Sequence, residues 1–168
     1  MIPILQTERL TLRAPVNTDF PVYRDFYADA DASAAYGGPL PAHLAFRKLA
    51  ADLGHWQLRG YGMWSIEEKT SDEMVGGAGL VWPEGWPRPE LTWWIIPSAR
   101  RKGYALEASR AVIAYAYEDL QWTQVETHMN DENEAARNLA RKLGGQVIAR
   151  QKFPDGVERD VFKLPASM

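Results

Sequence analysis

The segment PSARRKGYALEAS (residues 97–109) has residue types suited to binding a phosphorylated ligand. Arg100, Arg101 and Lys102 stand directly before Gly103 and a long helical pattern. The first N–H groups of a helix lack intrahelical acceptors, and the helix dipole places about half a positive charge there, which disfavours cations. A bound diphosphate would neutralise the three cations and accept hydrogen bonds from these amides. The spacing therefore predicts an anion-binding loop at the start of the helix.

Two other interpretations of this basic loop stay open. It could be a solvated surface loop, because short basic-glycine motifs occur widely without a ligand. It could also belong to a domain that binds RNA or another phosphate ligand. The formal net charge of -3 and the lack of a second basic stripe argue against nucleic acid as a partner.

Glu90 and His128 are the candidates for acid–base chemistry. Glu90 opens a predicted strand that continues through Trp93 and Trp94, and a carboxylate with apolar neighbours is suited to a general base. The alternative for Glu90 is an exposed strand start beside Arg88. His128 ends another predicted strand, where a lone histidine is equally compatible with a structural role.

The composition excludes several other kinds of site. The chain has no cysteine, so disulfides, thiolate-bound metal and a cysteine nucleophile are impossible. Its three histidines are scattered, and the HExxH, Walker and GxSxG patterns are absent from the sequence. We therefore expect no metal site.

Length and composition predict one domain, residues 1–168. The chain is 46% hydrophobic and 24% charged, which is typical of a globular protein with a single core. Its first residues lack the basic and apolar regions of a signal peptide, and no apolar run approaches the roughly 18 residues of a membrane span. We expect a cytoplasmic protein with no membrane partner.

Hydrophobic periodicity and turn residues predict the elements that position these side chains. The order β-α-α-β-β-β-α-β-α-β-β is typical of an α+β or mixed α/β fold with one central sheet. Three glycines in the third predicted strand indicate a bulge or a close backbone approach. The expected strands are 5–13, 63–68, 74–82, 90–96, 121–129, 146–153 and 157–164, and the expected helices are 20–28, 40–58, 103–120 and 133–143.

Four segments, in order, resemble the GCN5-related N-acetyltransferases (GNAT). RRKGYA, residues 100–105, matches the R/Q-x-x-G-x-G/A signature of that superfamily, within a stretch (90–120) that is similar to its fourth strand, pyrophosphate loop and third helix. Residues 125–144 resemble its fifth strand and fourth helix. TERLTLRAPVNTDF and WSIEEKTSDEMVGGAGL resemble the RimJ/RimL-like branch, which acetylates ribosomal-protein N-termini, and its small-molecule relatives.

The resemblance implies an acyl-CoA N-acyltransferase fold. This is a central, mostly antiparallel sheet that is splayed between its fourth and fifth strands and flanked by about four helices. It also implies a transferase with acetyl-CoA as co-substrate. The backbone of residues 101–105 would hold the pyrophosphate, and the strand 93–96 would pair with the pantetheine arm. The implied cofactor-binding residues are Trp94, Ile95, Ile96, Arg100, Arg101, Lys102, Gly103, Tyr104, Ala105, Asn133 and Arg137.

The resemblance further implies how acetyl would be transferred. With no cysteine, direct attack by an amine in a ternary complex is expected, with Glu90 as base and a strand N–H near Ile95 or Ile96 polarising the carbonyl. The sequence departs from the family at the fourth helix. The usual tyrosine acid is Ala140, the usual serine is Ala136, and Gly145 replaces the phenylalanine after the helix.

The acceptor would be a primary amine of a small molecule, an amino acid or a protein N-terminus. Trp82, Trp86, Trp93 and Trp94 either surround the acceptor or pack in the core. Because Ala136 and Ala140 replace the family's usual serine and tyrosine, a non-catalytic sensor that binds acyl-CoA stays open as an alternative function. A homodimer, common in this family, also stays open.

Overall fold

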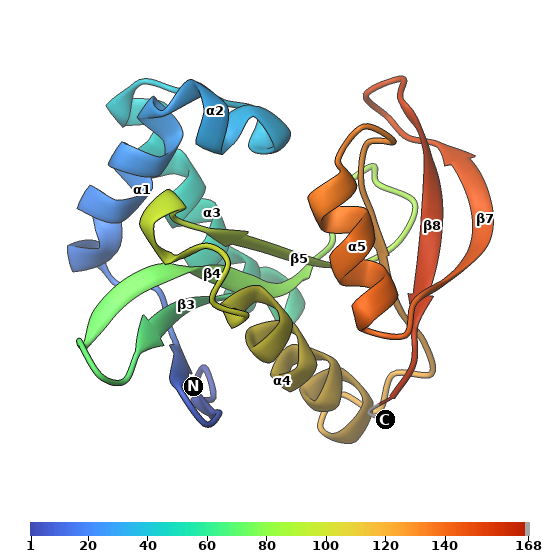
Figure 1. Ribbon diagram of the computed structural model, residues 1–168, viewed down its shortest axis with the longest axis horizontal. Coiled ribbons are helices and arrows are strands. Elements are labelled where there is room, and N and C mark those ends of the chain that lie inside the picture. The colour runs from blue at the N-terminus through green and yellow to red at the C-terminus, as the bar shows by residue number, and fades with distance from the viewer. Residues whose placement is uncertain (167–168) are drawn as a thin grey trace.

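A computed structural model of the chain describes residues 1–166. Figure 1 shows a sheet with helices on both faces and a separate strand pair beside α5. No helix among the described residues is long and apolar enough to cross a membrane. The helices are α1 Phe20–Ala28, α2 Ala30–Ser33, α3 Ala42–Arg59, α4 Tyr104–Glu118 and α5 Glu134–Lys142. The strands are β1 Leu5–Gln6, β2 Leu10–Arg13, β3 Met63–Glu68, β4 Glu73–Val81, β5 Glu90–Ile95, β6 Val125–His128, β7 Gln146–Lys152 and β8 Glu158–Leu164.

The predicted splay in the sheet is confirmed. An antiparallel sheet of five strands runs in the order β1-β2-β3-β4-β5, and a second sheet has the order β6-β8-β7. In the part of the chain that the structure describes, no ladder joins β5 to β6, although the Thr127 hydroxyl on β6 donates to the Leu91 carbonyl on β5 at 2.8 Å. The edge of β5 beyond that contact is therefore free of strand partners.

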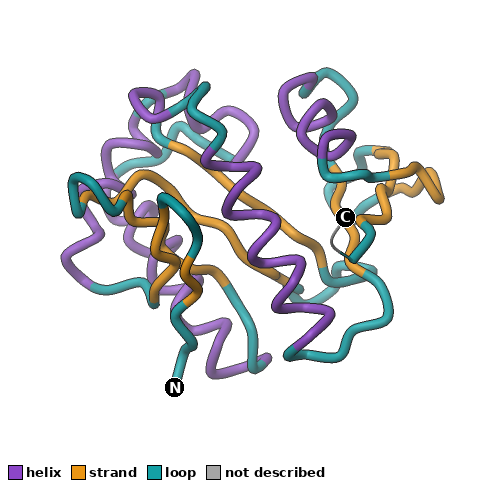
Figure 2. Tube along the Cα trace, turned by 60° about the horizontal axis from the view of Figure 1, so that its bottom comes forward, coloured by secondary structure: helices purple, strands orange, loops and turns teal. Residues whose placement is uncertain are grey.

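Two helical layers cover the five-stranded sheet. On one face, α4 packs Ala108, Val112 and Ala116 against buried side chains of β2 to β5. On the other face, α1 and α3 enclose Tyr23, Phe26 and Trp94. The long diagonal of α4 across the sheet is plain in Figure 2. Burial of both faces fixes the sheet rigidly and so fixes the direction in which β5 presents its free edge.

The predicted close backbone approach at the glycines of β4 is confirmed. A Cβ on Gly77 would lie 2.5 Å from the indole nitrogen of Trp94, and one on Gly76 would lie 2.1 Å from the Trp94 carbonyl oxygen. Only glycine permits this contact. Strand β5 can therefore lie close against β4, with Trp94 directed into the core.

One expectation about the N-terminal third is wrong. The predicted single strand 5–13 is a hairpin, because Thr7 and Leu10 exchange hydrogen bonds at 3.0 Å that reverse the chain. Residues 29–36, which lie between the predicted helices 20–28 and 40–58, contain α2 and a 3-10 turn at Ala34–Tyr36. The Asp29 side chain caps α2 by accepting from two amides, and Gly37 ends this segment in the left-handed conformation.

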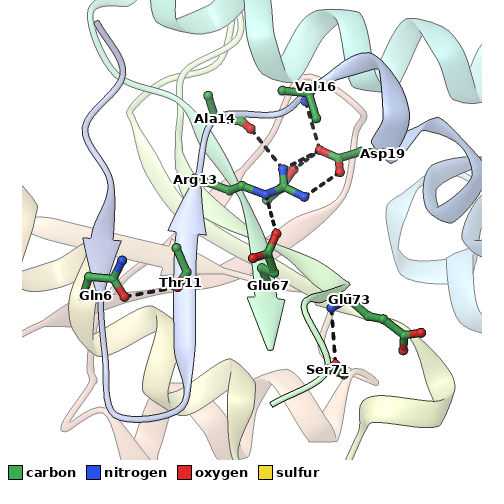
Figure 3. A network of polar contacts seen from close by, with 10 residues as sticks. Gln6, Thr11, Arg13, Ala14, Val16, Asp19, Glu67, Ser71 and Glu73 are labelled. Carbon is green, nitrogen blue, oxygen red and sulfur yellow. Dashed lines mark hydrogen bonds and ion pairs between the residues drawn. The ribbon is translucent and has the colours of Figure 1, made fainter. Parts of the chain in front are cut away.

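An ion network ties the N-terminal hairpin to the first helix (Figure 3). Arg13 donates to Asp19 at 2.8 and 3.0 Å and to Glu67 on β3 at 2.8 Å. Burial raises the pKa of Asp19, but hydrogen bonds from Arg13, the Val16 amide and Ser65 outweigh it and hold the pKa below its ordinary value. This network anchors the start of α1, whose continuation carries the α2 segment toward β5.

Candidate functional site

The basic loop lies where β5 gives way to α4. Arg101 and Gly103 both have left-handed backbone angles, φ 62° and 82°, so the chain turns sharply before the first residue of α4. The first helical hydrogen bond runs from the Glu107 amide to the Gly103 carbonyl at 3.0 Å. The amides ahead of it belong to the helix end that lacks intrahelical acceptors. This turn has the backbone geometry of an anion-binding loop.

The three cations of the loop differ in their surroundings. The Nε of Arg100 donates to the Ile95 carbonyl at 3.1 Å, so this side chain ties the loop back to β5. Arg101 and Lys102 are exposed. Tyr104 is buried, its hydroxyl donates to Glu68, and its ring centroid lies 5.9 Å from Lys102 Nζ. Arg101 and Lys102 are therefore the exposed cations of this turn whose side chains are not tied back to β5.

A carboxylate and a fourth cation, Arg9, complete the helix start. The Glu107 carboxylate accepts from the Arg9 amide and from Arg9 Nε, both at 2.7 Å, and from the Thr7 hydroxyl at 2.6 Å. Another guanidinium nitrogen of Arg9 donates to the Lys102 carbonyl at 2.8 Å. Glu107 in the first turn complements the helix dipole and partly compensates the cations placed before it.

The main-chain groups of successive β5 residues point alternately toward β4 and toward the free edge of the strand. The Ile96 amide donates to Val75 at 2.9 Å, so this N–H is already used. By the antiparallel alternation, Trp94 faces Gly77 of β4, whereas Leu91, Trp93 and Ile95 direct their main-chain groups to the other side. Of the two N–H groups expected to polarise a carbonyl, that of Ile95 lies on the free edge.

A cleft of about 310 Å³ opens beside this edge. It lies among the Tyr36 turn, β5, β6 and the turn between β7 and β8. Its lining combines aromatic rings, hydroxyls, amides and three charged side chains. These residues are Ala35, Tyr36, Gly37, Trp86, Glu90, Leu91, Thr92, Trp93, Thr127, His128, Met129, Asn130, Asn133, Ala136, Asp155 and Arg159.

Glu90 and His128, predicted from separate strands, meet in this cleft. Glu90 Oε2 lies 2.8 Å from His128 Nε2, with 18% and 6% of the two side chains exposed. The approach lacks hydrogen-bond geometry, and His128 Nε2 is a buried nitrogen without a hydrogen-bond partner among the described residues. The His128 ring lies parallel to Trp86 with centroids 5.8 Å apart, and 4.1 Å from Phe153. A carboxylate and an imidazole from two different strands thus lie side by side in the cleft.

The expected neighbour of Glu90, Arg88, is engaged elsewhere. Its guanidinium donates to the Glu126 carboxylate at 2.9 and 3.1 Å. The alternative in which Glu90 sits beside Arg88 as an exposed strand start does not describe this arrangement. Glu90 instead faces the cleft with His128.

The two predicted residues of α5 have different positions. Asn133 lines the cleft and also caps α5, since its Oδ1 accepts from the Ala136 amide at 3.2 Å. Arg137 pairs with Asp160 at 3.1 Å and lies over the Phe162 ring, outside the lining of the cleft. Ala140, the position of the missing tyrosine, is fully buried.

The four tryptophans near the loop 83–89 divide between the two predicted roles. Trp86 and Trp93 line the cleft. Trp94 is buried in the core with 3% exposed, and Trp82 donates its indole N–H to the Trp86 carbonyl at 2.8 Å. Two of the four therefore border the space beside Glu90, while the others hold the strand and the loop.

Sequence reasoning missed six polar residues of the cleft, of which Tyr36, Asp155 and Arg159 form the most distinctive contacts. The Tyr36 hydroxyl donates to the Trp93 carbonyl on the free edge of β5, and burial raises the pKa of Tyr36 to about 12. Arg159 is only 8% exposed and forms a bidentate pair with Asp155. No local motif marks them. Among residues 1–166, no group of three histidine, aspartate or glutamate side chains could hold a metal ion.

Comparisons with known proteins agree with this architecture. The family model described as "Acetyltransferase (GNAT) domain" matches residues 9–146. An uncharacterized N-acetyltransferase of Bacillus subtilis (strain 168), YoaA, is 25% identical over 95% of this chain and 94% of its own length. The crystal structure of an acetyltransferase from Agrobacterium tumefaciens str. C58 is 31% identical, with a TM-score of 0.90 over 98% of this chain and 95% of that one. The fold is also that of RimL, a ribosomal L7/L12 alpha-N-protein acetyltransferase in complex with coenzyme A (15% identity, TM-score 0.79, 99% and 100% covered).

Proposed function

Because the chain belongs to the GNAT acetyltransferase family, we propose that it transfers an acetyl group from acetyl-CoA to a primary amine by direct attack in a ternary complex. The observation that carries this proposal is the pairing of Glu90 with His128 in a cleft beside the free edge of β5. The opposite end of the same strand leads into the anion-binding loop. One strand would thus hold the cofactor and the reacting amine in line.

The loop and the free edge of β5 have the donors that a CoA thioester needs. The amides of residues 101–105 would bind the pyrophosphate, and the exposed cations Arg101 and Lys102 would neutralise it. The main-chain groups of Trp93 would pair with the pantetheine arm, the Ile95 N–H would be left for the thioester carbonyl, and the Asn133 side chain would contact the arm from the start of α5. The RimL structure with coenzyme A supports this placement, because its fold is the same.

The reaction requires a neutral amine and a polarised thioester carbonyl. Glu90 would take the proton of the acceptor ammonium, directly or through a water molecule, and His128 provides a second site for that proton 2.8 Å away. The amine nitrogen would then bond to the carbonyl carbon, whose oxygen would accept from the Ile95 N–H. The carbon–sulfur bond would break as the nitrogen gives up its second proton, which water carries to the solvent or to the departing thiolate. With Ala140 buried, the thiolate would leave unaided or take a proton from water.

Calorimetric titration of CoA and acetyl-CoA tests the cofactor half of this proposal. We expect micromolar binding that Arg101→Glu weakens by at least about tenfold, since it reverses an exposed charge at the loop. Arg110→Glu, an exposed charge reversal further along α4, is the matched control and should bind like the unaltered protein. Absence of CoA binding to the unaltered protein would contradict the proposal.

Release of free CoA in the presence of amines tests the transfer itself. The chain contains no cysteine, so a thiol reagent reports only the released CoA. Binding of acetyl-CoA with no transfer to any amine would instead favour the alternative function, a non-catalytic acyl-CoA-binding module. We further infer that residues 1–168 act as a single acetyltransferase domain in the cytoplasm.

A further inference from the structure

The charged side chains that line the cleft are Glu90, Asp155 and Arg159. Arg159 projects from β8 and is the cation among them. Its two terminal nitrogens donate to the two Asp155 oxygens at 3.0 and 2.6 Å, and its Nε donates to the Asn130 side chain at 2.8 Å. Each guanidinium nitrogen therefore already has an acceptor within the protein.

The pairing with Asp155 occupies the feature of Arg159 that would recognise a carboxylate. A planar guanidinium binds a carboxylate through two parallel N–H donors, and Asp155 fills that fork. The hydrogen bonds from Arg159 lower the pKa of Asp155, which keeps it ionised and the fork filled. The rings of Phe153 and Trp86 lie 5.2 and 5.9 Å from the guanidinium carbon and cover it further.

The charges of Arg159 and Asp155 cancel each other. Glu90 is then the uncompensated charge that an acceptor encounters in the cleft. Its charged neighbour is His128, which carries a positive charge only when protonated. The cleft therefore favours a cationic ammonium group. A carboxylate on the carbon next to that ammonium would face Glu90 and Asp155 with no free cation in the lining to balance it.

We propose that Asp155 makes the cleft selective for amines that carry no adjacent free carboxylate. Free amino acids are then poor acceptors, whereas amino-acid amides, peptide N-termini and simple alkylamines are good ones. The selection works by withholding Arg159 from the substrate rather than by an added contact. This inference rests on the proposed function, because it concerns the acceptor of the same reaction.

Matched acceptors test the selectivity without any variant. The probes are alanine, serine and tryptophan, their amides, and tripeptides that begin with the same residues, each with acetyl-CoA and detection of the released thiol. We expect kcat/KM for each amide or tripeptide to exceed that of the free amino acid by at least about tenfold. Equal rates for acids and amides would overturn the inference and leave the proposed function intact.

The Asp155→Asn variant tests the cause. It keeps a hydrogen-bond acceptor beside Arg159 and removes the charge, so the amide-to-acid ratio should fall by about fivefold or more through a gain on the free amino acids. Glu158→Gln is the control, because it removes an exposed carboxylate three residues away that does not line the cleft. An unchanged ratio in Asp155→Asn would overturn the inference. Failure of every probe to release CoA would contradict the proposed function as well.

Discussion

The two ends of strand β5 are built in different ways. Beyond its last residue, the loop 100–103 offers main-chain amides and exposed cations, and two left-handed residues shape it. At its first residue, the cleft consists of individual side chains from distant segments, and those of Glu90, His128 and Arg159 are largely shielded from solvent. The loop should therefore tolerate side-chain changes that spare its backbone, whereas the cleft should depend on single functional groups.

Removing the charge of Glu90 is expected to give the largest effect. Glu90→Gln keeps the size and deletes the base, so we expect kcat/KM for acetyl transfer to fall by at least about 100-fold. The affinity for CoA, measured by calorimetry, should stay within about twofold, because the loop is untouched. Glu84→Gln, in the exposed loop near Trp86, controls for the loss of one carboxylate. A fall of less than threefold would show that Glu90 is not the base.

The difference between the two ends also explains what could be predicted from the sequence. Arg100 to Ala105 is one contiguous motif before a strongly periodic helix, so the loop and α4 follow from local pattern alone. Glu90 and His128 were found because each ends or begins a predicted strand. Their contact, and the Arg159–Asp155 pair, depend on how β5, β6 and the β7–β8 hairpin are placed in space. No spacing along the chain encodes that placement.

The N-terminal third shows the same limit on a smaller scale. The alternation of Leu10 and Leu12 indicated a strand correctly, but the turn at Thr7 uses side-chain hydrogen bonds rather than glycine or proline. The α2 segment is held by the Asp29 cap. With four residues, it is too short to show a helical period in the sequence. Tyr36 ends the turn directly after α2, so its place in the cleft could not be predicted either.

A titrating carboxylate remote from the cleft must be separated from the chemistry at Glu90. Asp52 on α3 accepts from the Tyr23 hydroxyl at 2.7 Å, and burial raises its pKa to about 7, although Tyr23 and Lys48 oppose the shift. The carboxyl is protonated in both states below about pH 4. As the pH rises toward about 7, the unfolded chain releases the proton and the folded protein retains it, so the free energy of unfolding falls.

Asp52→Asn should remove this dependence. Relative to the unaltered protein, we expect the variant to gain about 2 kcal/mol of unfolding free energy between pH 4 and pH 8, a value reduced for partial solvent contact. Denaturant unfolding across this range provides the measurement. Asp25→Asn, an exposed change on α1, should show no such gain. Parallel curves for Asp52→Asn and the unaltered protein would contradict the prediction. The variant then serves as the background in which the pH dependence of transfer reports on the cleft.

Two glycine substitutions test whether the cofactor end depends on its backbone. Gly103 and Gly85 have nearly equal left-handed angles, φ 82° and 87°, but only Gly103 belongs to the anion-binding loop. Alanine at either position should lower the free energy of unfolding by about 1–2 kcal/mol, because the left-handed conformation is strained for it. Only Gly103→Ala should also weaken CoA binding, by about three- to tenfold. Equal CoA affinities in the two variants would mean that the loop does not hold the cofactor through its amides.

The smallest expected effect concerns Tyr36, which contacts β5 between its cleft end and its loop end. Its hydroxyl donates to the Trp93 carbonyl, and its pKa of about 12, raised by burial, keeps the phenol neutral at every pH of interest. It therefore acts as a hydrogen-bond donor that positions the free edge of β5, not as the acid that protonates the leaving thiolate. Tyr36→Phe should lower kcat about fivefold, the worth of roughly 1 kcal/mol for one neutral hydrogen bond, at all pH values alike. Tyr61→Phe, outside the cleft lining, should leave kcat unchanged. A pH–rate profile of Tyr36→Phe that loses its alkaline limb would instead identify the hydroxyl as a proton donor, and the departure from the family at Ala140 would then be compensated from the opposite wall of the cleft.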